Sequence, residues 1–432
     1  MVRRATLPLM SALALVLSAA PAAMSAPGDL DPTFGGDGIV RTDLTRFEDH
    51  GFAIALQSDG KIVVAGTKGL GGPNARVAVV RYATDGSLDP SFGGGDAKAT
   101  SDFTPREDFA YAVRIQADGK IVVAGPAAYF SHNSKFGLAR LTSDGSLDPT
   151  FGGDGIVVTD LTASSDVANG MALQANGKIV VVGGVSVGPD NGKIGVVRYR
   201  ADGSLDPLFS GDGKVFIDAT PTFDDGFAVG VQADGQIVVA GGGGFDGPNQ
   251  RFVLVALTRH GSLDPAVGGD GMVFTDVTPK ADSPFALAIQ ADGRIVVAGT
   301  AALGARDPKF AVVRYERDGS LDATFKGDGV VITNPTPNDD EAYSVAMAPD
   351  GKIVAAGFVG NNGPAPRIGI VRYLVNGTRD TTFGGNGIVT TDISPAFDSA
   401  WGVAVQADGS VVSSGTAGAG GDPAFAVLRY QP

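Results

Sequence analysis

The feature that most constrains the fold of this chain is a block of about 58 residues that is repeated seven times. The acidic residue of its Leu-Asp-Pro-like turn recurs at intervals of 58 or 59 residues, at Asp31, Asp89, Asp148, Asp206, Asp264, Asp322 and Asp380. A fixed period of this length indicates one supersecondary unit used many times, with each copy burying its apolar face against its neighbours. The sequence therefore predicts a repeat architecture and leaves the biochemical function to be argued from particular residues.

Each repeat contains four short runs of strand-forming residues and no helical periodicity. In the third copy these runs are residues 155–160, 169–174, 178–182 and 195–199, with the β-branched and aliphatic composition typical of strands. An Asp-Gly or Asn-Gly pair separates the second and third runs of every copy, which predicts a tight hairpin of type I′. Seven units of four antiparallel strands predict an all-β fold, a seven-bladed β-propeller. A solenoid is disfavoured because its coils are usually shorter.

The second run of each copy is predicted to be the innermost strand of a blade. It typically reads aromatic, small, aliphatic, small, aliphatic, Gln, so alternation places large residues on one sheet face and small residues on the other. Trp401 takes the aromatic position and is expected in the core. The first run then forms the outermost strand of the preceding blade. This leaves residues 38–43 as an orphan strand, which we expect to complete the last blade and close the ring.

Composition and the N-terminal residues predict where the protein acts. Residues 1–26 resemble a signal peptide, with Arg3 and Arg4 before a short apolar stretch and small residues up to Ala26, and residues 27–432 form a single propeller domain. The chain has no cysteine, which excludes disulfides, thiolate metal sites and a lipid-modified cysteine. A formal net charge of −14 argues against nucleic acid and anionic membrane surfaces as partners. We expect an exported protein, periplasmic or extracellular, that is neither a lipoprotein nor inserted in a membrane.

The repeat motifs resemble a known family. Residues 145–155 read Gly-Ser-Leu-Asp-Pro-Thr-Phe-Gly-Gly-Asp-Gly, and residues 116–125 read Gln-Ala-Asp-Gly-Lys-Ile-Val-Val-Ala-Gly. Both are similar to the delta-60 repeats of exported bacterial proteins, and the similarity extends along essentially the whole chain after residue 26. The resemblance implies a propeller-like fold and brings no activity, substrate or catalytic residue. Local departures are Val267 in place of Phe, Ala256-Leu257 in place of Arg-Tyr, and a degraded outer strand at residues 96–102.

An aspartate recurs eight residues before the Gln position of the second run. The seven residues are Asp49, Asp108, Asp166, Asp224, Asp282, Asp340 and Asp398. The strand direction places them on the top face, near the mouth of the channel. One interpretation is a cation site, because Ca²⁺ prefers several carboxylate and carbonyl oxygens. The other is that each aspartate accepts hydrogen bonds from the backbone of its own loop.

Four further residues are candidates for ligand binding on the top face: Arg114, Tyr129, His132 and His50. Arg114 stands where the other copies have Ala or Gly, so it would either hold an anionic ligand in the channel or pair with a nearby carboxylate. Tyr129 and His132 belong to a loop after the third run, and these loops differ most among the copies. His50 and His132 fall on adjacent blades, where acid–base or metal chemistry is one interpretation and chance placement the other.

These observations favour a non-enzymatic protein that binds a protein, a glycan or another surface component through its loop-rich top face. The alternative is a cation-dependent hydrolase or lyase with its site at the top of the central channel. A structural envelope protein without a specific ligand is the third possibility. The fold does not choose among them, because propellers host many functions. A deep pocket with perturbed carboxylates would favour the enzyme, and a broad, shallow surface would favour the binding protein.

Overall fold

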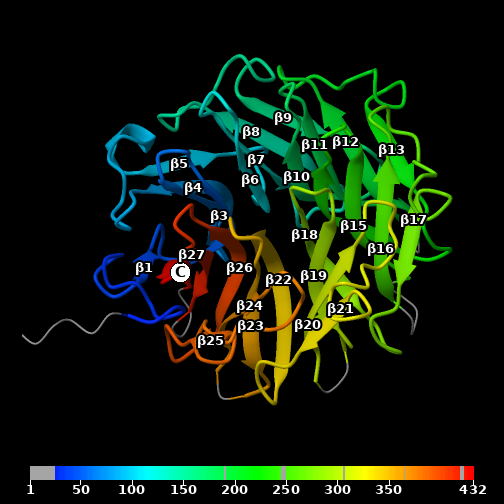
Figure 1. The fold of residues 1–432 in the computed structure, drawn as a ribbon. Coiled ribbons are helices and arrows are strands. Elements are labelled where there is room, and N and C mark those ends of the chain that lie inside the picture. Colours follow the sequence, from blue (N-terminus) through cyan, green and yellow to red (C-terminus); the bar gives the residue numbers. More distant parts are fainter. Residues whose placement is uncertain (1–24, 189–190, 245–249, 305–306, 364, 419–422) are drawn as a thin grey trace, which may run out of the picture.

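Seven four-stranded antiparallel sheets surround a central axis in the computed structural model, which confirms the predicted propeller (Figure 1). The structure describes residues 25–188, 191–244, 250–304, 307–363, 365–418 and 423–432, so the predicted signal peptide lies almost entirely outside the described residues. Within these ranges the helical structure is a short 3-10 turn, Gly93–Gly95. No helix in the described part of the chain is long and apolar enough to cross a membrane.

The strands of each blade follow one another from the channel outwards. Blades 1 and 2 consist of β2 (Glu48–Leu56), β3 (Ile62–Leu70), β4 (Arg76–Tyr82) and β5 (Lys98–Ser101), then β6 (Ala112–Ile115), β7 (Ile121–Ala127), β8 (Lys135–Leu141) and β9 (Ile156–Thr159). Blades 3 and 4 consist of β10 (Asp166–Leu173), β11 (Ile179–Gly188), β12 (Asn191–Tyr199) and β13 (Lys214–Ile217), then β14 (Asp224–Val231), β15 (Ile237–Gly243), β16 (Arg251–Leu257) and β17 (Met272–Thr275). Blades 5 and 6 consist of β18 (Ser283–Ile289), β19 (Ile295–Ala301), β20 (Lys309–Tyr315) and β21 (Val330–Thr333), then β22 (Asp339–Met347), β23 (Ile353–Asn361), β24 (Arg367–Tyr373) and β25 (Ile388–Thr391).

Blade 7 closes the ring with the first strand of the chain. It consists of β26 (Asp398–Val405), β27 (Val411–Ala417), β28 (Ala424–Tyr430) and β1 (Ile39–Thr42). β1 pairs with β28 in antiparallel register, and Leu30 forms a further bridge to Tyr430. The predicted closure by residues 38–43 is confirmed. The segment expected to be a degraded outer strand, residues 96–102, nevertheless forms β5.

The hairpins between the inner two strands form as predicted, but with a different turn. Gly60 donates a backbone hydrogen bond to the Gln57 carbonyl oxygen and has a φ of 83°, whereas Asp59 is absent from the residues with positive φ. A type I′ turn would need positive φ at both residues, so the type I′ prediction is wrong. The Oδ1 atom of Asp59 instead accepts a hydrogen bond from the backbone N–H of Lys61. A turn of this kind needs a glycine only at its left-handed position.

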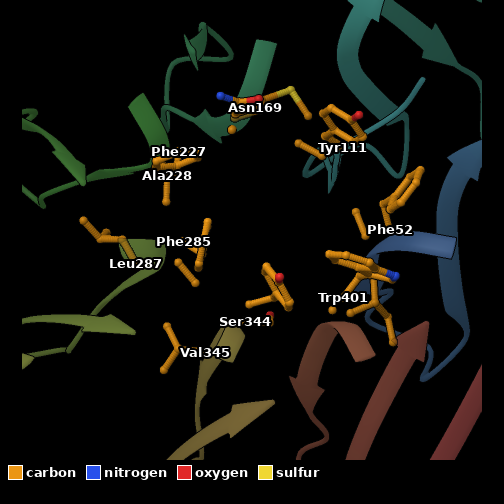
Figure 2. A pocket seen from close by; sticks show the side chains of 18 of the residues that line it. Phe52, Tyr111, Asn169, Phe227, Ala228, Phe285, Leu287, Ser344, Val345 and Trp401 are labelled. Carbon is orange, nitrogen blue, oxygen red and sulfur yellow. The ribbon is translucent and has the colours of Figure 1, made fainter. Parts of the chain in front are cut away.

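Large and small side chains alternate between neighbouring blades near the axis, as the inner-strand pattern predicts. A Cβ atom at Gly230 of β14 would lie 2.7 Å from side-chain atoms of both Leu287 and Ile289 in the next blade. The missing side chain therefore makes room for two aliphatic side chains. The same strands also form the wall of the central channel (Figure 2).

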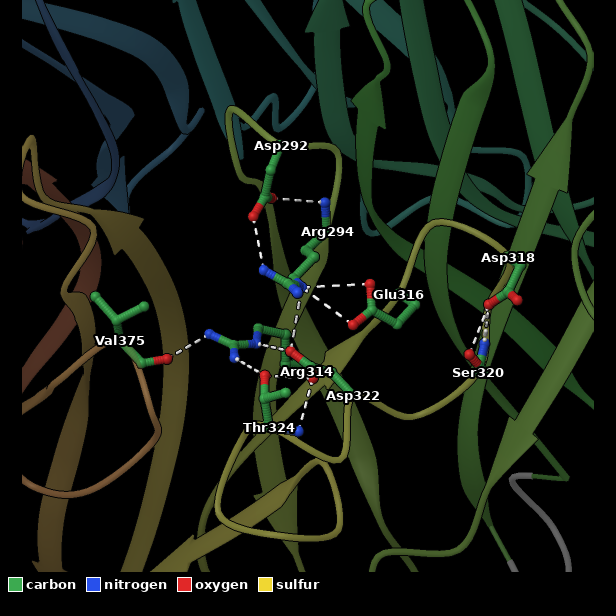
Figure 3. Close-up of polar contacts among 9 residues, drawn as sticks. All are labelled: Asp292, Arg294, Arg314, Glu316, Asp318, Ser320, Asp322, Thr324 and Val375. Carbon is green, nitrogen blue, oxygen red and sulfur yellow. Dashed lines mark hydrogen bonds and ion pairs between the residues drawn. The ribbon is translucent and has the colours of Figure 1, made fainter.

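In six of the seven blades an arginine of the third strand pairs with the aspartate of the Leu-Asp-Pro-like turn at the bottom face. Arg314 donates from Nε to Asp322 Oδ2 at 2.6 Å and from Nη1 to the Val375 carbonyl oxygen of the next blade at 2.5 Å (Figure 3). Its guanidinium also lies 4.5 Å from the centre of the Phe325 ring. We call this arrangement the Arg–Asp–Phe latch. It recurs with Arg81, Arg140, Arg198, Arg372 and Arg429 as the arginine.

Blade 4 lacks the latch because two of its residues are replaced together. Ala256 stands at the arginine position and Val267 at the phenylalanine position, while Asp264 remains. Gln236 Nε2 donates to Asp264 Oδ2 at 2.7 Å, so a neighbouring amide satisfies the carboxylate that the arginine would bind. Asp264 therefore keeps a hydrogen-bond partner although the arginine and the phenylalanine of the latch are absent.

Candidate ligand-binding site

The central channel contains a cavity of about 170 Å³ lined by the innermost strands of all seven blades (Figure 2). Its most prominent feature is a set of aromatic side chains, which we call the aromatic collar: Phe52, Tyr111, Phe227, Phe285, Tyr343 and Trp401. Each belongs to a different blade and is partly exposed to the channel. The collar surrounds a small cavity on the axis, which differs from the broad surface expected of a binding platform.

A β-bulge turns the collar residues toward the channel. The pairing of β26 with β27 shifts between Ala400 and Gly402, so Trp401 is an extra residue without a partner in β27. The same shift occurs at Phe52, Asn169, Phe227, Phe285 and Tyr343. A bulge interrupts the alternation of a strand and re-aims one side chain. The expectation that Trp401 lies in the core is therefore wrong.

A glycine of the second strand makes each bulge possible. A Cβ atom at Gly415 would lie 1.8 Å from the carbonyl oxygen of Ser399, and one at Gly66 would lie 1.8 Å from that of His50. Distances this short exclude any side chain, because real Cβ atoms essentially never come within 3.0 Å of such an atom. The glycine of the repeated Val-Ala-Gly motif is the sequence signal for the bulge.

Neighbouring collar residues contact one another around the channel. The ring centroid of Trp401 lies 5.8 Å from that of Phe52 and 4.6 Å from that of Tyr343. Phe52 and Tyr111 are separated by 5.1 Å, and the distances continue at 4.9 Å from Tyr343 to Phe285 and 5.3 Å from Phe285 to Phe227. These separations are typical of favourable aromatic pairs. The contacts fix the ring faces that a ligand in the cavity would meet.

Asn169 interrupts the collar in blade 3 and brings a carboxyl group to its edge. Its Nδ2 atom donates to Asp225 Oδ1 and to the Gly226 carbonyl oxygen, both at 3.0 Å. Burial raises the pKa of Asp225 to about 8, although the bonds from Gly226 and Asn169 act in the opposite direction. Asp225 stands two residues before the collar position of its own strand and does not line the cavity. Asn169 was missed in the sequence analysis, although it is visible there as the one polar residue at an aromatic position.

Glu341 is a second carboxyl group near the collar. Burial raises its pKa, and the Tyr343 hydroxyl donates a hydrogen bond to its Oε2 atom at 2.7 Å. Like Asp225, it stands two residues before a collar position and does not line the cavity. The cavity wall thus contains no carboxylate and no histidine among the described residues.

Arg114 is the one charged residue of the cavity wall within the described chain. Its Nη1 atom donates to the carbonyl oxygen of the adjacent Val113 at 2.9 Å. No carboxylate of a described residue forms an ion pair with it, so the described part of the chain does not supply the pairing partner considered in the sequence analysis. The side chain is exposed on the channel wall, and the protein around it lowers the pKa of Arg114 by desolvation. The group remains charged, since arginine does not lose its proton in proteins.

The seven recurring aspartates are buried and bonded within their own loops. Asp49 is representative: Oδ2 accepts hydrogen bonds from the backbone N–H groups of Leu44 and Thr45, and Oδ1 accepts from the Thr45 hydroxyl and the Gly69 N–H. Each of the other six also accepts a hydrogen bond from the hydroxyl of a Thr or Ser four residues earlier: Asp108, Asp166, Asp224, Asp282, Asp340 and Asp398. No group of three or more His, Asp or Glu side chains suited to a metal ion occurs in the described ranges. This geometry favours the loop-capping interpretation of these residues.

The remaining candidate residues lie at different distances from the collar. His50 stacks on Phe52 with ring centroids 5.7 Å apart, and Tyr129 packs edge-on against Tyr111 at 6.2 Å. Both therefore extend the collar toward the top face. His132 is exposed in the loop after β7, and no contact in the described part of the chain joins it to His50. The structure does not bring the two histidines together.

The fold and the collar define the class of this protein as a seven-bladed β-propeller with a cavity on its axis. Residues 57–92, 116–151, 174–209, 232–266, 290–325 and 348–383 match the family model described as "Domain of unknown function (DUF5122) beta-propeller". The chain is thus built from β-propeller repeats of this family. No curated protein matches it.

Among solved structures, the chain resembles virginiamycin B lyase from Staphylococcus aureus, with 12% identity and a TM-score of 0.51 over 90% of this chain and 98% of that one. A catalytically inactive form of that lyase from the same organism, solved with quinupristin, is 11% identical, with a TM-score of 0.51 and the same two coverages. The polysaccharide lyase Uly1 is 12% identical, with a TM-score of 0.49 over 88% of this chain and 90% of that one. At these identities the likeness to the bacterial lyase concerns the fold alone.

Proposed function

We propose that this chain is an exported, non-enzymatic binding protein of the delta-60 repeat type, and that its ligand is the end of a glycan held in the central cavity. The observation that carries the proposal is the aromatic collar around a cavity of about 170 Å³. The negative faces of aromatic rings attract the weakly positive C–H faces of a sugar ring. Aromatic walls with a few polar groups are also typical of small-ligand sites.

Three features support ligand binding rather than catalysis. The cavity wall carries no carboxylate or imidazole among the described residues, so an acid–base pair is missing where a ligand would sit. The recurring aspartates use their oxygens within their own loops, which leaves no preformed cation site. The collar is fixed by bulges and mutual contacts, so little ordering is required when a ligand enters.

A hydrolase or lyase at the same cavity is the second candidate. The observation in its favour is Asp225, whose pKa of about 8 is suited to proton transfer near neutral pH. Its bond to Asn169 connects it to the cavity edge. In this candidate the carboxyl group would exchange a proton with a ligand that displaces or contacts the Asn169 amide.

Fluorescence titration tests the proposal, because Trp401 is the one tryptophan of the chain and belongs to the collar. We expect neutral mono- and oligosaccharides to quench or shift its emission in a saturable way, with the sugar recovered unchanged by chromatography. A shorter product after incubation would instead support the enzyme. If no sugar changes the emission and calorimetry on the W401F variant is also silent, the collar is not a glycan site.

A further inference from the structure

Arg114 differs from the latch arginines of the propeller, because it is exposed on the wall of the channel. Each latch arginine is held by an aspartate, a phenylalanine ring and a neighbouring hydroxyl or carbonyl group, as Arg314 illustrates. Arg114 has five N–H donors and a single hydrogen bond to the described protein, to the Val113 carbonyl oxygen. Its remaining donors face the channel. Arg114 thus presents an exposed guanidinium to the cavity, and no ion pair with a described residue occupies it.

The fold does not require an arginine at this position. The equivalent residues of the other inner strands are Ala55, Ala172, Gly230, Ala288, Ala346 and Ala404. Their blades have the same four-stranded sheets and the same packing around the axis. Arg114 therefore adds nothing that a small side chain does not supply in six other blades, and its charge needs a different explanation.

We propose that Arg114 binds the carboxylate of a sugar acid whose ring stacks on the aromatic collar. This deepens the proposed glycan-binding function and rests on it. Arg114 and the collar line the same cavity: Tyr111 directly precedes β6 and Arg114 lies within it, three positions further along the chain or about 10 Å in an extended strand. A guanidinium binds a carboxylate through two parallel hydrogen bonds, which fixes the orientation of the ring above it.

The size and charge of the cavity define the ligand class. A cavity of about 170 Å³ is comparable to the roughly 150 Å³ that accommodates one benzene molecule, so it admits a single six-membered ring with its acid group. The net charge of −14 repels ligands with many negative charges at long range. One carboxylate on an otherwise neutral sugar satisfies both conditions, as in a terminal uronic acid.

The test compares D-glucuronate with D-glucose, two probes that share a ring and differ in one charge. We expect the wild-type protein to bind glucuronate at least about tenfold more tightly than glucose, as measured by Trp401 fluorescence and calorimetry, since a charge-assisted hydrogen bond contributes that much. R114A should bind both sugars with the wild-type affinity for glucose. R114K should retain part of the preference, because lysine keeps the charge but loses the bidentate geometry.

Each outcome separates the two proposals. R114A is expected to have an unchanged melting temperature, because alanine occupies the same position in five other blades, and this confirms that the variant is folded. Equal affinity of the wild-type protein for both sugars, or a preference that survives in R114A, would overturn the role of Arg114 and leave glycan binding intact. Failure of both sugars to bind at tens of millimolar would overturn glycan binding and, with it, this inference.

Discussion

Closure of the ring depends on Phe34, which precedes β1. Its side chain is fully buried among residues of blades 7 and 1, and the Arg429 guanidinium lies 4.8 Å from the centre of its ring. Asp31 accepts a hydrogen bond from Arg429 Nε at 2.6 Å, so this segment supplies two of the three parts of the last latch. The substitution Phe34→Ala should therefore weaken the contact through which the start of the chain is held to its end.

The expected loss of unfolding free energy in F34A is large enough to measure. Replacing a buried phenylalanine by alanine costs about 3–5 kcal/mol of unfolding free energy. For ~400 ordered residues the unfolding entropy is about 0.8 kcal/mol/K, so each kcal/mol lowers the melting temperature by about 1 °C. We expect the melting temperature of F34A to fall by about 4–6 °C. Deletion of residues 27–43, which also removes β1 and Asp31, should lower it further.

Differential scanning calorimetry measures both changes in the protein without its predicted signal peptide. The matched control is Phe216→Ala, since Phe216 lies on the outermost strand of blade 3 with 42% of its surface exposed. F216A should change the free energy of unfolding by less than about 1 kcal/mol. If F34A and F216A melt alike, or if the deletion leaves the melting temperature unchanged, the closure does not stabilise the ring as the geometry indicates.

Four other measurements follow from the structure. Gly415→Ala should disrupt the bulge and shift the emission of Trp401, whereas Gly188→Ala, which has free space around it, should do neither. The pKa of Asp225 is about 8 in the folded state and 3.8 in the unfolded state, so the folded state binds the extra proton between these values. The free energy of unfolding should therefore fall as the pH rises from 4 to 8, by at most about 1.4 kcal/mol per pH unit. Urea titrations measure this fall, and D225N should flatten it. Arg314→Ala removes one of the two arginines that pair with Asp322, while Arg294 remains, and should cost about 1.5–3 kcal/mol by the same titrations. The melting temperature should be the same with calcium as with EDTA, whereas a rise with calcium would show that the recurring aspartates bind the ion.

The fold was predictable because each of its determinants is local and repeated. The number of blades follows from the seven copies, and the position of each inner hairpin follows from its glycine. Even the closure could be predicted, since residues 38–43 have strand composition and no partner within their own copy. The turn type was not predictable from the Asp-Gly pair alone, because the backbone N–H of Lys61 donates a hydrogen bond to the Asp59 carboxylate and this contact accompanies a different turn.

The site was predictable only in part, because it depends on contacts between copies. Alternation along the inner strand assigned Trp401 to the core, and the bulge that overrides this alternation involves the carbonyl oxygen of Ser399 and a glycine on the next strand. The fourth hydrogen bond of Asp49 comes from Gly69, twenty residues later, which the spacing of the aspartates does not reveal. That no carboxylate of the described residues pairs with Arg114 is likewise a property of the assembled channel.

Repetition within one chain separates the residues that serve the fold from those that serve the site. When blade 4 loses its latch arginine, Asp264 still accepts a hydrogen bond from Gln236, which stands where blade 5 has a second cationic partner, Arg294, so the carboxylate stays paired. Arg114 is the opposite case: a charge is gained at a position where six copies have none, and no carboxylate of the described chain balances it. An exposed guanidinium on the wall of the aromatic cavity, without such a partner, is where a ligand that carries a negative charge would bind.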